Sequence, residues 1–120
     1  MLLKFYVENY CSFKDEVCLD LIAAKSRKKK SHLIYDRCGK ATCVLPLAII
    51  FGANGSGKTN LFRALAFMKM LVVDGTNRNS AIPIEPYKGA LSAKNPISRF
   101  EVMIKVDGVL YTYGFVIDDK

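Results

Sequence analysis

The segment Gly52–Asn60 holds the residues whose types and spacing could do chemistry. Its sequence, GANGSGKTN, separates Gly52 from Gly57 by four residues, and Lys58 and Thr59 follow at once, as in the G-x-x-x-x-G-K-[ST] pattern of a phosphate-binding loop. The glycines let backbone N–H groups approach phosphate oxygens, the ammonium of Lys58 would lie on the β- and γ-phosphates, and the Thr59 hydroxyl would be the metal ligand for Mg²⁺. Asn60 is placed to reach the α-phosphate. We therefore predict ATP and Mg²⁺ as cofactors, with the nucleotide bound by Gly52, Ala53, Asn54, Gly55, Ser56, Gly57, Lys58, Thr59 and Asn60.

Such a loop needs a buried strand before it and a helix after it. The run VLPLAIIF, Val44–Phe51, is almost continuously apolar and predicts a strand buried on both faces of a parallel sheet, with Pro46 near its start. From Lys58 onward the apolar residues follow helical spacing up to Gly75, which is placed to end the helix, and apolar side chains on its other faces predict wide burial. The alternative is a glycine-rich turn that binds no ligand.

The rest of the described pattern predicts strands and one irregular connection. Residues 2–9 alternate with Leu3, Phe5 and Val7 on one face, and residues 17–24 predict a second strand. Residues 76–98, which are rich in Pro, Gly, Ser and Asn, predict an irregular connection. Residues 99–118 predict a hairpin around a type I′ turn at Asp107-Gly108. The expected pairs are Val106 with Val109, Ile104 with Tyr111, Val102 with Tyr113 and Phe100 with Phe115.

Length and composition favour one globular domain. The chain has 120 residues, of which 51% are hydrophobic, so it can bury a core and is not expected to be disordered. No run of 18 apolar residues and no signal-peptide pattern occur, so the sequence predicts a cytoplasmic protein without a membrane partner.

Four cysteines raise the question of a metal site. Cys38 and Cys43 lie near His32, but no tight Cys-x2-Cys pair is present, so free thiols are expected and a zinc site is the alternative. Cys11 and Cys18 are expected to pack within or beside strands.

The formal net charge of +7 is concentrated in one basic run. Its consecutive cations are Arg27, Lys28, Lys29 and Lys30. A solvated loop is the first interpretation, and contact with nucleic-acid phosphates is the second. No aromatic residue is interleaved, so base stacking is not indicated.

The order of these elements resembles the N-terminal lobe of ABC-type ATPases of the SMC, RecF and RecN kind. It is more closely similar to bacterial "AAA family" ATPases related to OLD nucleases and antiphage defence ATPases. The resemblance rests on LLKFYVENYCSFKDEV, on FGANGSGKTNL with Asn54 and Asn60, and on FEVMIKVDGVLYTYGFVID. It implies an α/β P-loop NTPase fold, specifically the N-terminal part of an ABC-type head with a mixed sheet and an antiparallel hairpin.

The resemblance also implies what this lobe does not carry. Residues 1–120 would be a single partial ATPase domain whose partner is a second lobe or a second head in a homodimer. Members of the group use a Q-loop glutamine, a signature segment, a Walker B acid and a switch histidine, whereas this sequence has no glutamine and its one histidine precedes the loop. No catalytic residue is therefore assigned. Many relatives carry a basic residue where this chain has Cys11, and Lys14 or the basic run are the candidates to replace it.

Three functions remain open at this point. The first is an ATP-binding lobe that hydrolyses little ATP by itself. The second is a self-sufficient small NTPase, in which Asp118 or Asp119 would serve as the metal-facing acid. The third is a basic nucleic-acid-binding module with a relic phosphate loop.

Overall fold

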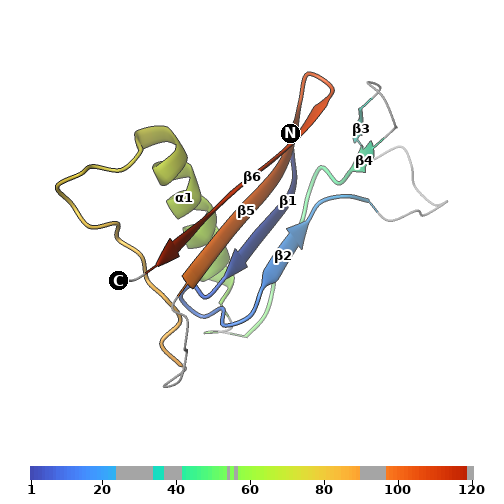
Figure 1. The fold of residues 1–120 in the computed structure, drawn as a ribbon. Helices are drawn as coiled ribbons and strands as arrows, with labels where there is room; N and C mark the ends of the chain where they lie inside the picture. The colour runs from blue at the N-terminus through green and yellow to red at the C-terminus, as the bar shows by residue number, and fades with distance from the viewer. Residues whose placement is uncertain (24–33, 37–41, 54, 56, 90–96, 119–120) are drawn as a thin grey trace.

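The computed structural model describes residues 1–23, 34–36, 42–53, 55, 57–89 and 97–118. Its elements, in chain order, are β1 (Leu2–Glu8), β2 (Val17–Asp20), β3 (Ile34–Asp36), β4 (Thr42–Val44), α1 (Lys58–Asp74), β5 (Ile97–Val106) and β6 (Val109–Asp118). Figure 1 shows a sheet in the order β2-β1-β5-β6 with α1 against one of its faces, and the short β3-β4 pair set apart from it.

The four-stranded sheet is antiparallel at every junction. The β5–β6 hairpin has the predicted register, including Phe100 opposite Phe115 and Val102 opposite Tyr113. Its turn residues Asp107 and Gly108 have φ of 50° and 78°, as a type I′ turn requires. β1 pairs with both β2 and β5, so the N-terminal strand lies inside the sheet although it is first in the chain.

One face of the sheet packs against α1 to form the core. The predicted alternation in β1 is confirmed, because Leu3, Phe5 and Val7 are all buried. From the helix, the buried side chains are Leu61, Ala64, Phe67 and Met68. Three aromatic rings join the helix to the sheet: the Phe67 ring centroid lies 5.7 Å from that of Tyr10 and 5.2 Å from that of Phe100.

Burial of the helix is narrower than the sequence predicts. Its bounds and its end at Gly75 are confirmed, since the Gly75 N–H donates to the Leu71 carbonyl at 3.1 Å. Phe62 and Val73 are nevertheless 60% and 71% exposed. The helix meets a single layer, so only one stripe of it can be covered among the described residues.

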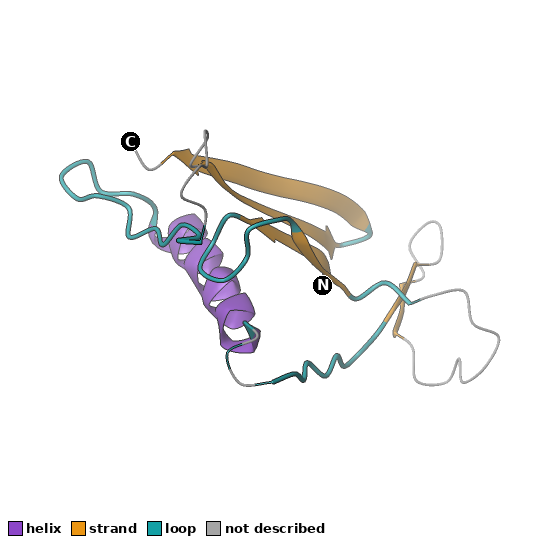
Figure 2. Cartoon of the chain, turned by 90° about the horizontal axis from the view of Figure 1, so that it is seen from below, coloured by secondary structure: helices purple, strands orange, loops and turns teal. Residues whose placement is uncertain are grey.

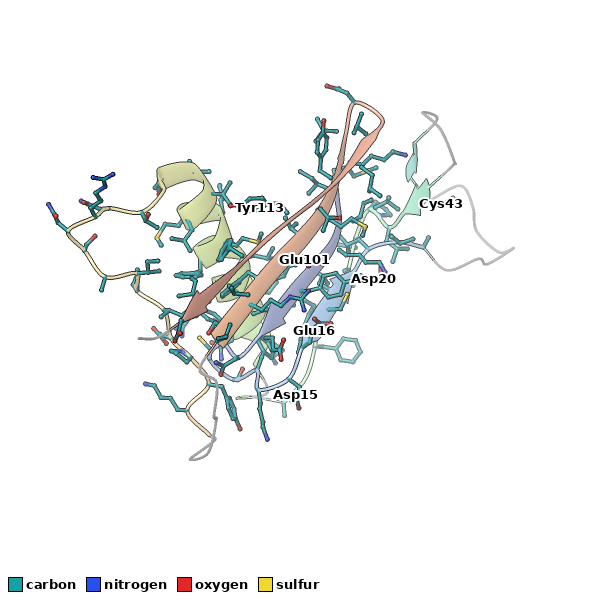
Figure 3. All side chains as sticks on the ribbon, viewed as in Figure 1. Asp15, Glu16, Asp20, Cys43, Glu101 and Tyr113 are labelled. Atoms are coloured by element: carbon teal, nitrogen blue, oxygen red, sulfur yellow. The ribbon has the colours of Figure 1, made fainter. Side chains whose placement is uncertain are left out.

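The other face of the sheet carries ion pairs. Lys4 of β1 pairs with Asp20 of β2 at 3.1 Å, and Arg99 pairs with Glu101 of the same strand, β5, at 3.0 Å. Asp20 and Glu101 lie along the sheet in Figure 3. A backbone N–H bond from Ile22, followed by the contact with Lys4, holds the pKa of the Asp20 carboxyl below its ordinary value. These exposed pairs mark the solvent side and add little to stability.

The buried strand predicted over Val44–Phe51 is wrong in this structure. β4 ends at Val44 and pairs with β3, with one further bridge from Val44 to Ile22, and residues 45–51 form no strand. Leu47, Ile49 and Phe51 are 70%, 75% and 88% exposed. Figure 2 shows this segment running from β4 toward the start of α1, away from the four-stranded sheet.

The physical reason is that a doubly buried strand needs neighbours on both sides. No described strand runs parallel to residues 45–51, and Pro46 has no N–H to donate to one. The described sheet is therefore antiparallel rather than mixed. The second predicted strand, residues 17–24, is likewise shortened to Val17–Asp20, after which the Leu45 N–H donates to the Leu21 carbonyl at 2.8 Å.

Candidate functional site

The glycine-rich loop leads directly into the uncapped N-terminus of α1. Gly55 and Gly57 have φ of 83° and 99°, a backbone region that favours glycine, and Gly57 is the N-cap of α1. No side chain caps this end of α1, and no acidic residue lies in its first turn. The first-turn N–H groups and the positive end of the helix dipole are thus directed at the place where an anion would bind.

Lys58 brings its charge to the same place. Its ammonium donates to the carbonyl of Gly52, so the side chain folds back across the loop. Beside it is a hollow of about 180 Å³ lined by Gly55, Gly57, Lys58, Thr59 and Asn60. The structure therefore brings together five of the predicted binding residues and holds Gly52 close to Lys58. Ala53 is exposed nearby, and Asn54 and Ser56 lie outside the described residues.

The turn between β1 and β2 packs against the glycine-rich loop at Gly57. A Cβ atom on Gly57 would lie 2.6 Å from Ser12 Oγ and 3.3 Å from the Phe13 ring, so only glycine fits against this turn. The Asn60 side-chain amide donates to Ser12 Oγ at 2.9 Å. Sequence reasoning missed this contact, because 48 residues separate its partners and neither lies on a periodic pattern. Asn60, predicted to face the α-phosphate, is positioned by Ser12.

A second cavity of about 270 Å³ adjoins the hollow through Asn60. Besides Asn60, it is lined by Cys11, Ser12, Arg63, Glu85, Pro86 and Lys88. Lys14, one of the predicted substitutes for a cation at position 11, is not among the lining residues. Arg63 and Lys88 are the cations that the fold brings to Cys11, and neither was identified from the sequence.

Hydrogen bonds connect the segment that carries Glu85 to the residues that follow β1. The Cys11 N–H donates to the Glu85 carbonyl at 2.8 Å, and the Tyr87 N–H donates to Asn9 Oδ1 at 3.2 Å. The Cys11 thiol donates to Glu85 Oε2 at 3.8 Å. Burial raises the pKa of the Cys11 thiol, so it stays protonated at neutral pH and acts as a donor.

The other predicted residues lie away from the loop or outside the described chain. Asp118 ends β6, opposite Ile97 at the hairpin base, as the hairpin prediction required. Cys18 is exposed rather than packed, and Cys11, Cys18 and Cys43 are free thiols. The described residues contain no cluster of His, Cys, Asp or Glu that could hold a metal. The basic run, His32, Cys38 and Asp119 are outside the described part.

A larger cavity, of about 760 Å³, lies between the end of α1 and residues 75–83. Its described lining contains none of the motif residues, so it is separate from the glycine-rich loop. Within the described chain, no helix combines the length and the apolar character that crossing a membrane demands.

Comparison with known proteins places the loop, α1 and the β5–β6 hairpin in one family. A family model described as "AAA domain, putative AbiEii toxin, Type IV TA system" matches residues 47–120, which is more than half of the chain. No curated protein matches the sequence. The matched region begins just before the glycine-rich loop and includes α1, β5 and β6.

Proposed function

The chain belongs to this AAA-domain family, and we propose that its nucleotide-binding, ATPase-like module binds Mg-ATP between Gly52 and Asn60. The observation that carries the proposal is that no side chain caps the N-terminus of α1. A helix begins at Lys58 with no side-chain cap, directly after two glycines with positive φ. This arrangement supplies N–H donors, a dipole and an ammonium at one point, which suits a polyphosphate.

Lys58 is proposed to contact the β- and γ-phosphates. Its bond to the neutral Gly52 carbonyl is weaker than a bond to an anionic phosphate oxygen, where both partners are charged, so a bound nucleotide would replace it. The bond also keeps the ammonium over the loop before the nucleotide arrives.

Thr59 is proposed as the protein's ligand for Mg²⁺. It follows Lys58 in the first turn of α1 and lines the same hollow, and a hydroxyl oxygen is a donor that a hard cation accepts. When bound, Mg²⁺ would neutralise charge on the β- and γ-phosphate oxygens. One protein ligand is enough to bring in the metal together with the nucleotide, because Mg²⁺ retains waters and phosphate ligands.

Hydrolysis is proposed to require residues from a second lobe or a second ATPase head. A water molecule attacking the γ-phosphate must be oriented by an acidic or amide group. Near the hollow the described residues offer Glu85, which lines the adjoining cavity, while Asp118 is at the base of the β5–β6 hairpin and lines neither cavity. The described chain thus supplies binding groups and no positioned base.

The test is phosphate release by the purified chain in the presence of Mg-ATP. We expect turnover indistinguishable from the Lys58→Ala variant and unchanged by Asp118→Asn. Turnover of about 1 s⁻¹, within the ordinary range for enzymes, that is lost in Asp118→Asn would contradict the proposal and establish a self-sufficient NTPase.

A further inference from the structure

The cavity next to the glycine-rich loop is lined by one carboxylate, two cations and two short polar side chains, in addition to Cys11 and Pro86. Resting on the proposed function, we propose that it holds the ribose of the bound nucleotide, that Glu85 accepts hydrogen bonds from the ribose hydroxyls, and that the site does not select the base. Glu85 is thereby a specificity-determining residue, and nothing in the loop motif itself assigns it a role.

The position of the cavity follows the path of a bound nucleotide. The hollow for the phosphates and the cavity share Asn60, and Arg63 lies about one helical turn further along α1. A ligand whose phosphates occupy the hollow can therefore extend past Asn60 into the cavity.

The charges of the cavity fit a sugar phosphate better than a simple anion. Arg63 and Lys88 are cations suited to the α-phosphate, whereas Glu85 would repel a second polyphosphate. An ionised carboxylate accepts hydrogen bonds only, and the ribose hydroxyls are the donors of a nucleotide that lie nearest to its phosphates. The described residues provide no third acidic or thiol group for a metal here.

Glu85 is held in place while most of its acceptor capacity stays free for a ligand. Its backbone carbonyl is fixed by the Cys11 N–H at 2.8 Å, and Tyr87, two residues on, is fixed by Asn9. The carboxylate of Glu85 accepts from the Cys11 thiol at 3.8 Å, and a thiol is a weak donor. A hydroxyl group would compete with it successfully.

The residues that line this cavity explain why the site would not select between nucleotide bases. None of the described residues that line the cavity is aromatic, so the described lining offers no ring for base stacking. The volume of about 270 Å³ is below the roughly 300 to 1,000 Å³ of pockets that enclose drug-sized ligands, so the base would extend toward solvent.

Equilibrium binding of Mg-ATP, Mg-GTP and Mg-2′,3′-dideoxy-ATP to the whole chain tests this inference. We expect ATP and GTP to bind within about threefold of one another. Dideoxy-ATP, which lacks both hydroxyl donors, should bind about tenfold more weakly, the size expected for loss of a hydrogen bond to a charged group. Equal affinity for ATP and dideoxy-ATP would overturn the role of the ribose, and a tenfold preference between ATP and GTP would overturn the base tolerance.

Variants then locate the acceptor. Glu85→Ala should lower ATP affinity to the level of dideoxy-ATP and leave dideoxy-ATP unaffected, with Glu85→Gln giving a partial loss. Glu16→Ala is the matched control, because Glu16 is an exposed carboxylate whose ion-pair partner, Arg99, lies outside the cavity. A tenfold ratio of ATP to dideoxy-ATP that survives in Glu85→Ala would overturn the assignment of Glu85.

The outcomes separate this inference from the proposed function. Lys58-dependent binding of ATP and dideoxy-ATP with equal affinity would overturn the ribose site alone. Absence of Lys58-dependent binding for every nucleotide would overturn the proposed function, and the ribose site with it.

Discussion

Gly57 has two roles that no other residue could combine. Its φ of 99° turns the chain into α1, and its missing side chain lets the loop rest on Ser12 and Phe13. A methyl group at 2.6 Å from Ser12 Oγ would force either the Ser12 side chain or the loop to move. The conformation of the glycine-rich loop therefore depends on the turn that follows β1 as well as on its own glycines.

The phenol of Tyr10 gives the chain a pH dependence at the residue scale. Burial, first of all, raises the pKa of Tyr10 from 10.0 to about 12. Between these two pH values the unfolded chain loses this proton while the folded chain keeps it, so the free energy of unfolding falls there. Its full contribution is present below pH 10.

Urea unfolding at pH 9 and pH 11 checks this prediction. We expect Tyr10→Phe to lose less stability between the two pH values than the wild-type chain. Tyr111→Phe, which removes a half-exposed phenol, is the control and should retain the wild-type loss. An equal alkaline loss in wild type and Tyr10→Phe would show that Tyr10 is not the responsible group.

At the scale of elements, α1 is held by one stripe of side chains. Phe67 is 7% exposed and contacts two aromatic rings, whereas Phe62 on the same helix is 60% exposed. We expect Phe67→Ala to lower the free energy of unfolding by about 3 to 5 kcal/mol, since it removes a large buried side chain and leaves a cavity.

Phe62→Ala is the matched control and should cost less than about 1 kcal/mol. Chemical unfolding followed by circular dichroism measures both values. Similar losses in the two variants would mean that a further layer covers the outer face of the helix.

In the segment between β4 and the glycine-rich loop, the structure differs from the sequence-based prediction of a buried strand. Leu47 and Ile49 are exposed here, so the double change Leu47→Ser and Ile49→Ser should alter the free energy of unfolding by less than about 1 kcal/mol. It should also reduce the fluorescence of a dye that binds exposed apolar surface. A loss of more than about 3 kcal/mol in the free energy of unfolding would contradict this expectation and favour the buried strand predicted from the sequence.

What the sequence could predict in these elements was local. The hairpin register follows from alternation around Asp107-Gly108, and the end of α1 follows from Gly75. The contact of Asn60 with Ser12 and the approach of Glu85 to Cys11 join segments 48 and 74 residues apart. No periodicity encodes such pairs, so the loop motif was found from the sequence and the adjoining cavity was not.

The strand prediction failed for a related reason. An apolar run indicates that a segment can be buried, but burial also requires neighbouring strands. Among the described residues the only pairing near this run is β3 with β4 and the bridge from Ile22 to Val44. Partners for residues 45–51 cannot be read from the run itself.

At the scale of the whole molecule, the sheet brings distant segments together near the glycine-rich loop. β1 leads into the turn at Ser12, β5 follows the segment that carries Glu85, and α1, which begins at the loop, packs against the sheet. Binding is thus expected to depend on the folded core as well as on the motif, and a nucleotide should raise the unfolding temperature.

Equilibrium binding of Mg-ATP to wild type, Lys58→Ala and Lys69→Ala is the most direct test of the central claim. Lys69 is the control, an exposed lysine on the same helix. Loss of the charge-assisted contact should cost about 1.5 to 3 kcal/mol, or roughly tenfold to a hundredfold in affinity, in Lys58→Ala only. Equal affinity in all three proteins would mean that the nucleotide does not occupy this loop.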